Sequence, residues 1–240
     1  MDTDISKLQQ IIDGSDNIVF FGGAGVSVES GIPDFRSEHG IYNQSYEYPA
    51  EEILSHEFFY THTEYFYQFN REKIYKLDAL PNQAHKKLAQ LEQAGKVSAV
   101  ITQNIDGLHQ AAGSKNVFEL HGSIHRNFCL NCHKEYSAQY IYENKGIPKC
   151  TCGGIIKPDI VLYGETLNSY VLQKSMEYIS NADVLIIGGT SLSVYPAAGM
   201  VDAYKKNKLV LINKTPTQRD HIADYIFYGS IGEIFSRITC

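Results

Sequence analysis

Residues 18–27, which read IVFFGGAGVS, form an apolar run that ends in a glycine-rich turn. Four consecutive apolar residues, Ile18–Phe21, predict a strand that is buried on both faces. Glycines directly after such a strand let the backbone approach a diphosphate, whose charge the N–H groups and a following helix N-terminus would meet. This stretch therefore predicts an α/β fold with a nucleotide site at the end of its first strand.

Further apolar runs repeat the strand pattern along the chain. They are Ser98–Ile101, Val117–Leu120, Val184–Ile187, Leu209–Ile212 and Tyr225–Tyr228. Helix-period segments lie between several of them, at Asn82–Ala94, Asn168–Ser180 and Ala197–Lys206. The first two segments begin with an asparagine suited to an N-cap, and Gly95 follows the first as a C-cap glycine would. Apolar strands alternating with helices predict a doubly wound, Rossmann-like parallel sheet covered on both faces.

Polar residues follow several of these strands. Besides the first glycine turn, they are Gln103–Asp106, His121, Gly188–Ser191 and Asn213. Ligands of open parallel sheets bind beyond the carboxyl ends of the strands, so these residues predict one shared site. The first turn lacks the third glycine of the dehydrogenase fingerprint, because Val28 stands there. No acidic residue ends a second strand about twenty residues on, which also disfavours a dehydrogenase.

Composition and charge narrow the class of protein. The chain has 240 residues, 43% of them apolar and 20% charged, with a net charge of −6. Such a chain suits one large domain with a smaller insertion, and its charge disfavours nucleic acid and membrane surfaces as partners. No apolar run has the length of a membrane span, and Met1–Asp4 lacks the features of a secretion signal. We therefore expect a cytoplasmic protein, and a monomer.

Four cysteines, Cys129, Cys132, Cys150 and Cys152, are grouped in two pairs. Two such pairs on separate turns can hold one structural Zn²⁺ ion in a closed Cys₄ site. Two disulfides or buried free thiols are the alternatives, and a reducing cytosol disfavours the disulfides. The second pair has a single intervening residue, and the glycines after it would give the backbone room to turn around the metal. No role is predicted for Cys240.

Two segments interrupt the alternation of strands and helices. Residues 37–81 are rich in aromatic residues and predict helices without strands, and residues 123–157 contain the four cysteines. We expect the two segments to form a smaller lobe together. The larger, nucleotide-binding domain would then consist of residues 1–36, 82–122 and 158–240.

Seven stretches, in order and spacing, make the chain resemble the sirtuins of the bacterial type, the NAD-dependent protein deacylases. They are Gly23–Ser27, Gly31–Arg36, Thr102–Asp106, His121-Gly122, the four cysteines, Pro158–Val161 with Gly164-Glu165, and Gly189–Ser191. The resemblance covers nearly the whole chain. It implies an NAD-binding Rossmann-like domain facing the helical and zinc lobe across a cleft. It also implies transfer of acetyl, or other neutral acyl groups, from protein lysines to ADP-ribose, with release of nicotinamide and O-acyl-ADP-ribose.

The resemblance assigns roles to individual residues. His121 would be the general base, since imidazole titrates near working pH, and Asn104 and Asp106 would complete the catalytic group. The residues expected to hold NAD are Gly23, Ala24, Gly25, Asp34, Phe35, Arg36, Gln103, Asn104, Asp106, Gly189, Thr190, Ser191, Asn213 and Ser230. The residues expected to contact the acyl-lysine substrate, bound as an extended peptide by strand addition, are Val161, Leu162, Tyr163, Gly164, Val194 and Tyr67.

The acyl group can be narrowed by one further comparison within the family. Sirtuins that remove succinyl or malonyl groups resemble one another in a Tyr-x-x-Arg pair that grips the acyl carboxylate. Here Tyr67 is present, but Asn70 stands at the partner position and Arg71 comes one residue later. One step along an α-helix turns a side chain by ~100°, so Arg71 should point away from Tyr67. The resemblance then favours uncharged acyl groups.

Two other functions are compatible with the same motifs. A protein mono-ADP-ribosyltransferase would cleave nicotinamide from NAD in the same way and use another acceptor. A non-catalytic NAD-binding module would use the zinc lobe only to dock a partner. The presence of Asn104, Asp106 and His121 together disfavours the non-catalytic alternative.

Overall fold

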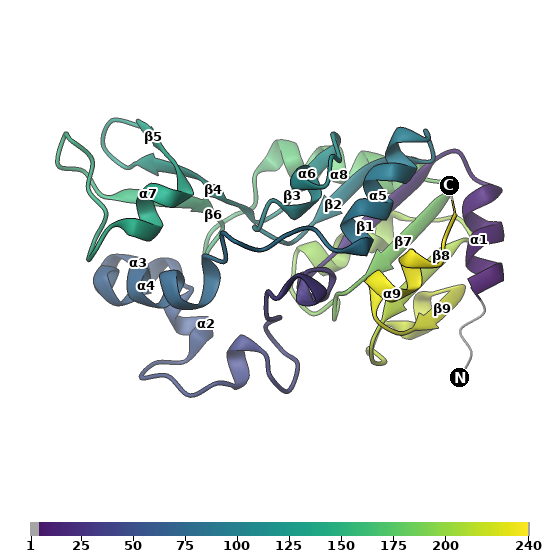
Figure 1. Cartoon of the computed structure of the whole chain (residues 1–240), viewed down its shortest axis with the longest axis horizontal. Coiled ribbons are helices and arrows are strands. Elements are labelled where there is room, and N and C mark those ends of the chain that lie inside the picture. Colours follow the sequence, from purple (N-terminus) through teal and green to yellow (C-terminus); the bar gives the residue numbers. More distant parts are fainter. Residues whose placement is uncertain (1–4, 240) are drawn as a thin grey trace.

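A six-stranded parallel sheet forms the centre of the larger part of the molecule (Figure 1). The computed structural model describes residues 5–239, so Cys240 and Met1–Asp4 lie outside the described residues. The strand order is β3-β2-β1-β7-β8-β9. The strands are β1 (Ile18–Gly22), β2 (Val97–Thr102), β3 (Val117–Glu119), β7 (Val184–Gly188), β8 (Leu209–Asn213) and β9 (Tyr225–Tyr228). The predicted parallel sheet is confirmed, and its strand order reverses between β1 and β7, where such sheets bind ligands.

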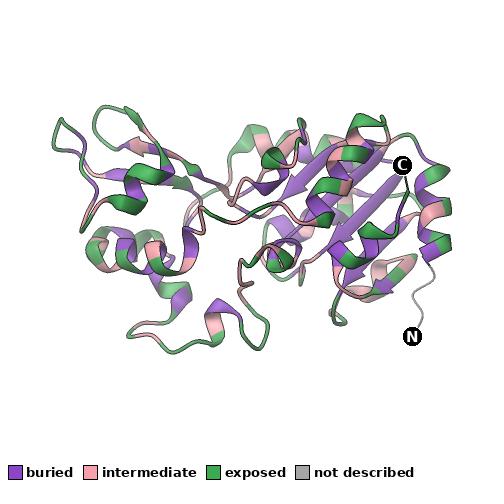
Figure 2. Ribbon diagram, in the orientation of Figure 1, coloured by how far each residue is buried: buried purple, intermediate pink, exposed green. Residues whose placement is uncertain are grey.

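Both faces of this sheet are covered, because successive side chains of a strand point to opposite sides. Ile18 and Phe20 of β1 pack in one core with three helices, α1 (Ile5–Asp13), α5 (Gln83–Gln93) and α9 (Ile231–Ser236). Val19 and Phe21 pack in a second core with α8 (Ser169–Asn181) and the 3₁₀ helix η5 (Ala197–Ala203). Figure 2 shows the central strands β1, β7 and β8 as continuously buried, whereas the edge strands β3 and β9 are partly exposed. Within residues 5–239, no helix is long and apolar enough to cross a bilayer.

The predicted helix ends are confirmed at two asparagines. Asn82 accepts a hydrogen bond from the Ala84 amide, and Asn168 accepts from the amides at the start of α8. Gly95, with a φ of 74°, follows α5 in the left-handed region that favours glycine. The third predicted helix differs, since η5 is a 3₁₀ helix that contains Gly199, and glycine weakens an α-helix. Helix α1 was not predicted.

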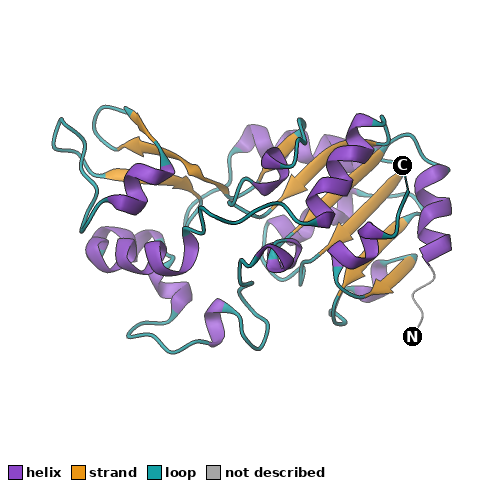
Figure 3. Ribbon diagram, in the orientation of Figure 1, coloured by secondary structure: helices purple, strands orange, loops and turns teal. Residues whose placement is uncertain are grey.

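The smaller lobe has its own core and its own sheet (Figure 3). Its helices are α2 (Ala50–Ile53), α3 (His56–Thr61), α4 (Thr63–Phe69), the π-helical turn η4 (Asn70–Ile74) and α7 (Ala138–Glu143). Its antiparallel sheet, in the order β5-β4-β6, has the strands β4 (Gly122–Cys129), β5 (Glu135–Tyr136) and β6 (Ile156–Ile160). One cluster of buried side chains joins the helical segment to the cysteine segment. The two insertions therefore pack as one body, at the opposite end of the molecule from α1 (Figure 1).

Short helical turns complete the chain. They are η1 (Ala24–Val26), η2 (Val28–Ser30), η3 (Ile41–Asn43), α6 (Leu108–Ala111) and η6 (Asp220–Ile222). The glycine turn after β1 thus leads into η1 and η2 rather than into a long α-helix. The helix expected to begin after this loop is therefore replaced by two short 3₁₀ turns.

Candidate functional site

The two glycine turns lie against each other at the point where the strand order reverses. The Gly25 amide donates to the Gly189 carbonyl at 2.8 Å, and the Gly23 amide donates to the Gly188 carbonyl at 3.2 Å. A Cβ atom on Gly25 would lie 2.8 Å from the Gly189 Cα atom, closer than real Cβ contacts. Glycines here allow one backbone to rest directly on the other. Ala24 and Gly25 remain partly exposed beside this contact.

Ser27 joins two of the predicted catalytic residues through its hydroxyl. It donates to Asp106 Oδ2 at 2.6 Å and accepts from Asn104 Nδ2 at 3.0 Å. His85 Nε2 lies 3.5 Å from the same oxygen. The Asn82 amide donates to His85 Nδ1, so the proton of this ring is on Nε2 and faces Ser27. The network holds the Asn104 amide and the Asp106 carboxylate in fixed orientations.

Ser27 and His85 are the site residues that the sequence analysis missed. Ser27 could have been identified because it lies inside one of the seven stretches that resemble the sirtuins. His85 could have been identified because it follows the N-cap Asn82 by three residues. Behind them, His109 is fully buried with its ring centroid 4.7 Å from that of His85. Burial lowers the pKa of His85 to about 4 and lowers that of His109 well below its ordinary value. Both rings are therefore neutral packing groups near pH 7.

His121 lies at the carboxyl end of β3, where its ring is fixed by a backbone carbonyl. Its Nδ1 atom lies 2.9 Å from the carbonyl oxygen of Gln103, which can only accept, so Nδ1 carries the proton. Nε2 then keeps its lone pair. Burial lowers the pKa of His121 below its ordinary value of 6.5, against the opposing effect of the Gln103 bond. The structure thus places a neutral imidazole against Gln103. Asn104 directly follows Gln103, and Asp106 lies in the same segment.

Gly122 makes this position of His121 possible. Its φ is 75°, and a Cβ atom there would lie 1.8 Å from the Asp159 carbonyl oxygen. The backbone therefore turns directly from His121 into β4, which pairs with β6. The His121 carbonyl in turn accepts from the Val161 amide at 3.0 Å. The candidate base is linked in this way to the segment predicted to bind substrate.

Loop residues 34–36, predicted to cover the ribose and diphosphate, are held by their own neighbours. Asp34 Oδ1 accepts from the amides of Arg36 and Ser37, at 3.1 and 2.8 Å, so its carboxylate shapes the loop. The ring of Phe35 packs on Tyr42 with centroids 5.3 Å apart. The Arg36 guanidinium lies over the Tyr42 ring and 3.7 Å from Glu51. Arg36 is exposed, so a diphosphate could replace this loose ion pair.

The ends of β7 and β8 are joined by side-chain hydrogen bonds. Asn213 accepts from the Thr190 amide at 3.1 Å and donates to the Thr190 carbonyl at 3.0 Å. Gln103 Nε2 donates to the Thr190 hydroxyl at 3.1 Å, which connects this group to the end of β2. Ser230 begins α9 directly after Gly229, whose amide donates to the Asn213 carbonyl. The structure thus brings all of these predicted residues to one edge of the sheet.

The segment predicted to bind the substrate peptide, Val161–Gly164, is held in place by hydrogen bonds within the chain. The Tyr163 amide donates to the Leu54 carbonyl, and the Tyr163 carbonyl accepts from the His56 amide. The Leu162 amide donates to Glu165 Oε2 at 2.9 Å. Strand addition would have to use the remaining backbone groups, such as those of Gly164, which is exposed.

The facing segment lies beside the second glycine turn. Ser191 and Ser193 share a hydrogen bond between their hydroxyls at 2.7 Å, and both side chains are exposed. The Val194 carbonyl accepts from the Ala198 amide at 2.8 Å, which fixes Val194 at the start of η5. Val194 itself is partly exposed. An extended peptide could pair with this segment and with Gly164 at the same time only if the peptide lies between the two segments.

Arg71 does not point away from Tyr67, so that expectation is wrong. Its guanidinium lies over the Tyr67 ring, 5.5 Å from the centroid, because the chain makes a π-helical turn over Asn70–Ile74 instead of an α-helical one. The Arg71 guanidinium nevertheless already has hydrogen-bond partners, since it donates to the carbonyls of Ile141 and Gly146. Tyr67 is fully buried and donates its hydroxyl to the Ile156 carbonyl. Its role in substrate binding stays a prediction.

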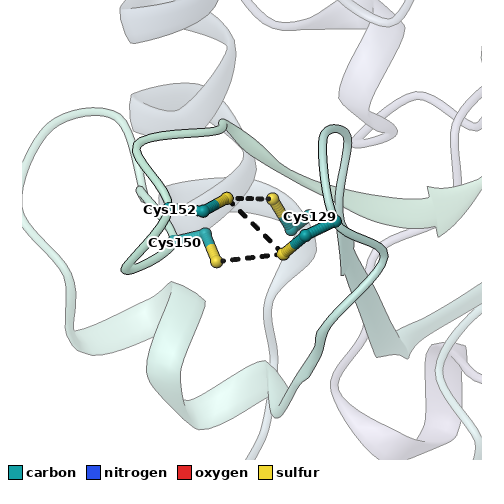
Figure 4. A group of neighbouring side chains, drawn as sticks. Cys129, Cys150 and Cys152 are labelled. Carbon is teal, nitrogen blue, oxygen red and sulfur yellow. Dashed lines mark hydrogen bonds between the residues drawn. The ribbon is translucent and has the colours of Figure 1, made fainter.

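The four cysteines converge on one point, as Figure 4 shows for three of them by label. All four sulfur atoms lie within 4.8 Å of one another, with pairs such as Cys129–Cys152 at 3.4 Å and Cys132–Cys150 at 3.5 Å. These distances are far longer than the ~2.05 Å of a disulfide bond. They are near the S–S spacing of about 3.8 Å around a tetrahedral ion with Zn–S bonds of about 2.3 Å. The donor set and its geometry therefore fit Zn²⁺.

The pKa values of the clustered cysteines also favour a cation at this point. The Cys152 amide and the Tyr136 hydroxyl lower the pKa of Cys150 to about 5. The Gly154 amide lowers the pKa of Cys152, but hydrogen bonds with the three other sulfur atoms raise it to about 12. Four thiolates this close would repel one another, and a divalent cation would remove that repulsion. Gly154 is required beside them, because a Cβ there would lie 2.7 Å from Cys129 Sγ.

Similar proteins are found for nearly the whole chain. Residues 23–196 match the model of the Sir2 family. A Clostridium acetobutylicum protein named NAD-dependent protein deacetylase is 55% identical over 98% of this chain and 97% of its own length. A Clostridium perfringens protein of the same name is 54% identical over 99% of both chains. A solved Sir2 complex with a deacetylated p53 peptide and 3′-O-acetyl-ADP-ribose superposes with a TM-score of 0.89, at 39% identity over 97% of this chain and 96% of that one.

Proposed function

Because this chain belongs to the Sir2 family, we propose that it is an NAD-dependent protein deacetylase in which His121 is the general base. It transfers acetyl groups from protein lysine side chains to the ADP-ribose part of NAD and releases nicotinamide and O-acetyl-ADP-ribose. The two Clostridium relatives support this activity by name. A Sir2 structure bound to acetylated peptide, at a TM-score of 0.85, supports acylated-lysine peptides as the substrate class. NAD is the co-substrate, and one Zn²⁺ ion held by the four cysteines is structural.

The observation that carries the proposal is the fixed tautomer of His121. Its Nδ1–H is bound to Gln103, so Nε2 is the atom that accepts a proton. The lowered pKa keeps the ring neutral at pH 7, which is the form a general base requires. When NAD is bound, its nicotinamide ribose supplies the electrophilic carbon and the hydroxyl that His121 deprotonates.

The remaining polar residues orient NAD. Ala24 and Gly25 approach the diphosphate through their backbone, and Arg36 neutralises its charge. Asp106 receives the nicotinamide amide, and its carboxylate is aimed by the Ser27 hydroxyl. Asn104, held by the same hydroxyl, orients the ribose. A preorganised group of this kind costs no reorganisation when the charge develops.

The expected partners of the protein are acylated-lysine proteins. Val161–Gly164 and Val194 would pair with an extended acyl-lysine peptide, which reads the backbone more than the side chains. A net charge of −6 disfavours nucleic acid and anionic lipid as partners. Cytoplasmic location and a monomeric state stay predictions.

Deacetylation is expected to exceed desuccinylation in kcat/KM by about one to two decades. A succinyl carboxylate would lose its hydration, and a charge-assisted hydrogen bond worth roughly 1.5–3 kcal/mol would be missing. Arg71 cannot supply it, because its guanidinium is bound to the carbonyls of Ile141 and Gly146. Steady-state kinetics on matched acetyl- and succinyl-lysine peptides measure the ratio.

The same experiment has a direct contrary outcome. Equal wild-type rates on both peptides, with the succinyl rate lost in Arg71→Ala, would show that Arg71 reaches the acyl carboxylate. A different substitution, Asn70→Arg, would restore the Tyr-x-x-Arg spacing of the sirtuins that remove succinyl groups. Asn70 is fully buried and bonded to the Phe66 carbonyl, so an arginine there must first displace core packing.

Identification of the ADP-ribose product distinguishes deacetylation from ADP-ribosyl transfer. The proposal requires one O-acetyl-ADP-ribose for each nicotinamide released from an acetylated peptide and NAD. Nicotinamide release with ADP-ribose attached to protein would instead identify a mono-ADP-ribosyltransferase. NAD binding without nicotinamide release would identify a non-catalytic module.

A further inference from the structure

Two tyrosine hydroxyls connect the loop predicted to cover NAD with the segment predicted to bind peptide. Tyr42 Oη and Tyr163 Oη lie 2.7 Å apart and share a hydrogen bond across 121 positions of sequence. Tyr42 belongs to η3, directly after the exposed loop, and Tyr163 precedes Gly164. Neither hydroxyl has been given a role in the reaction.

Tyr163 is a fixed anchor for this contact. Its amide donates to the Leu54 carbonyl at 3.0 Å, and its carbonyl accepts from the His56 amide at 2.9 Å. Both backbone groups of Tyr163 thus have partners within the chain, and only the side chain of Tyr163 extends away from the segment. Tyr163 is 39% exposed, on the segment that the peptide would pair with. A bound peptide would therefore cover it.

Tyr42 carries the contact to the residues that face NAD. Its amide donates to the Phe35 carbonyl at 2.9 Å, its ring packs on Phe35, and the Arg36 guanidinium lies over the ring at 5.1 Å. The Tyr42 side chain therefore contacts Phe35 and Arg36 with its ring and Tyr163 with its hydroxyl.

We propose that the Tyr42–Tyr163 hydrogen bond is a positioning contact that couples peptide binding to the placement of Phe35 and Arg36 on NAD. A peptide lying over Tyr163 excludes water from the hydroxyl pair, which strengthens the bond and holds the loop in place. NAD, by ordering the loop, then favours the peptide equally, because coupling between two ligands is reciprocal. The inference rests on the proposed function only for the identity of the two ligands.

Removal of either hydroxyl is expected to weaken this coupling. In the wild type, an acetyl-lysine peptide should lower the Kd of a carbocyclic NAD analogue, whose glycosidic bond is not cleaved. In Tyr42→Phe and in Tyr163→Phe that gain should shrink by about three- to tenfold, the worth of one neutral hydrogen bond. The double variant should lose no more than either single variant, because both remove the same bond. Calorimetric titrations of the analogue, with and without saturating peptide, measure all four proteins.

A matched control separates coupling from general damage. Tyr60→Phe removes a hydroxyl from an exposed tyrosine of the same lobe, which packs on His56, and it should leave the coupling at the wild-type value. Equal coupling in the wild type and Tyr163→Phe, additive losses in the double variant, or an uncoupled wild type would each overturn the proposal. The titrations need no turnover, so a failure of deacetylation in separate assays would count against the proposed function and not against this contact.

Discussion

Replacement of His121 by alanine is expected to lower deacetylation by about 10²–10⁴-fold, the usual contribution of a general base. The folded protein should remain, because the ring contributes one hydrogen bond, to the Gln103 carbonyl. Binding of NAD should also remain, since the glycine turns and Arg36 are untouched. Initial rates on an acetyl-lysine peptide, together with a thermal melt and an NAD titration, test all three statements. Activity within threefold of the wild type would remove His121 from the mechanism.

His221→Ala is a matched control, because His221 is exposed and lies in η6, away from β3. It should retain wild-type rates. The pH profile offers a second test. The pKa of His121 is lowered, so the neutral, active form persists as pH falls and is lost only below 6.5, the ordinary value. An acid limb of kcat/KM that lies above pH 6.5 would contradict this account.

Serine in place of any one zinc ligand is expected to yield insoluble or zinc-free protein. Structural zinc sites contribute about 10–16 kcal/mol of binding free energy to folding, which matches the whole stability of a typical domain, about 5–15 kcal/mol. The site also orders the turn between β4 and β5 and the turn before β6, and thereby the small-lobe core, since Cys129 and Cys150 are themselves part of that core. Elemental analysis and solubility of Cys150→Ser measure the effect.

Cys240→Ser is the control for this substitution, because Cys240 is the one cysteine of the sequence outside the two predicted ligand pairs. It should keep one zinc ion per chain and full activity. Soluble, active protein without zinc, either as Cys150→Ser or after chelation, would show that the module folds without the metal.

The sheet and its ligand edge were predictable because short apolar runs, glycine turns and asparagine caps act locally. The apolar run Ile18–Phe21 is buried on both faces, as its composition predicts, and Asn82 caps α5 through residues next to it in sequence. The same holds for the cysteines, whose spacing alone limits what they can bind. These features require only residues close in sequence, so the pattern of the chain contains them.

The parts that could not be predicted depend on distant contacts. The antiparallel pairing of β4 with β6 joins segments about 30 residues apart, and the direction of Arg71 depends on carbonyls in the other insertion. The Ser27 network likewise brings together three separate segments, the first glycine turn, α5 and the loop after β2. The π-helical turn after Phe69 changed the angle that an α-helix would have given. No local propensity specifies these features.

The central claim is NAD-dependent deacetylation, and mass spectrometry of acetyl-, succinyl- and myristoyl-lysine peptides tests it most directly. Each peptide is incubated with the wild-type protein, with and without NAD. The account predicts that the acetyl-lysine peptide loses its acetyl group only when NAD is present, with equal amounts of nicotinamide and O-acetyl-ADP-ribose formed. An acetyl-lysine peptide that stays intact with NAD, or that loses its acetyl group equally without it, would contradict the account.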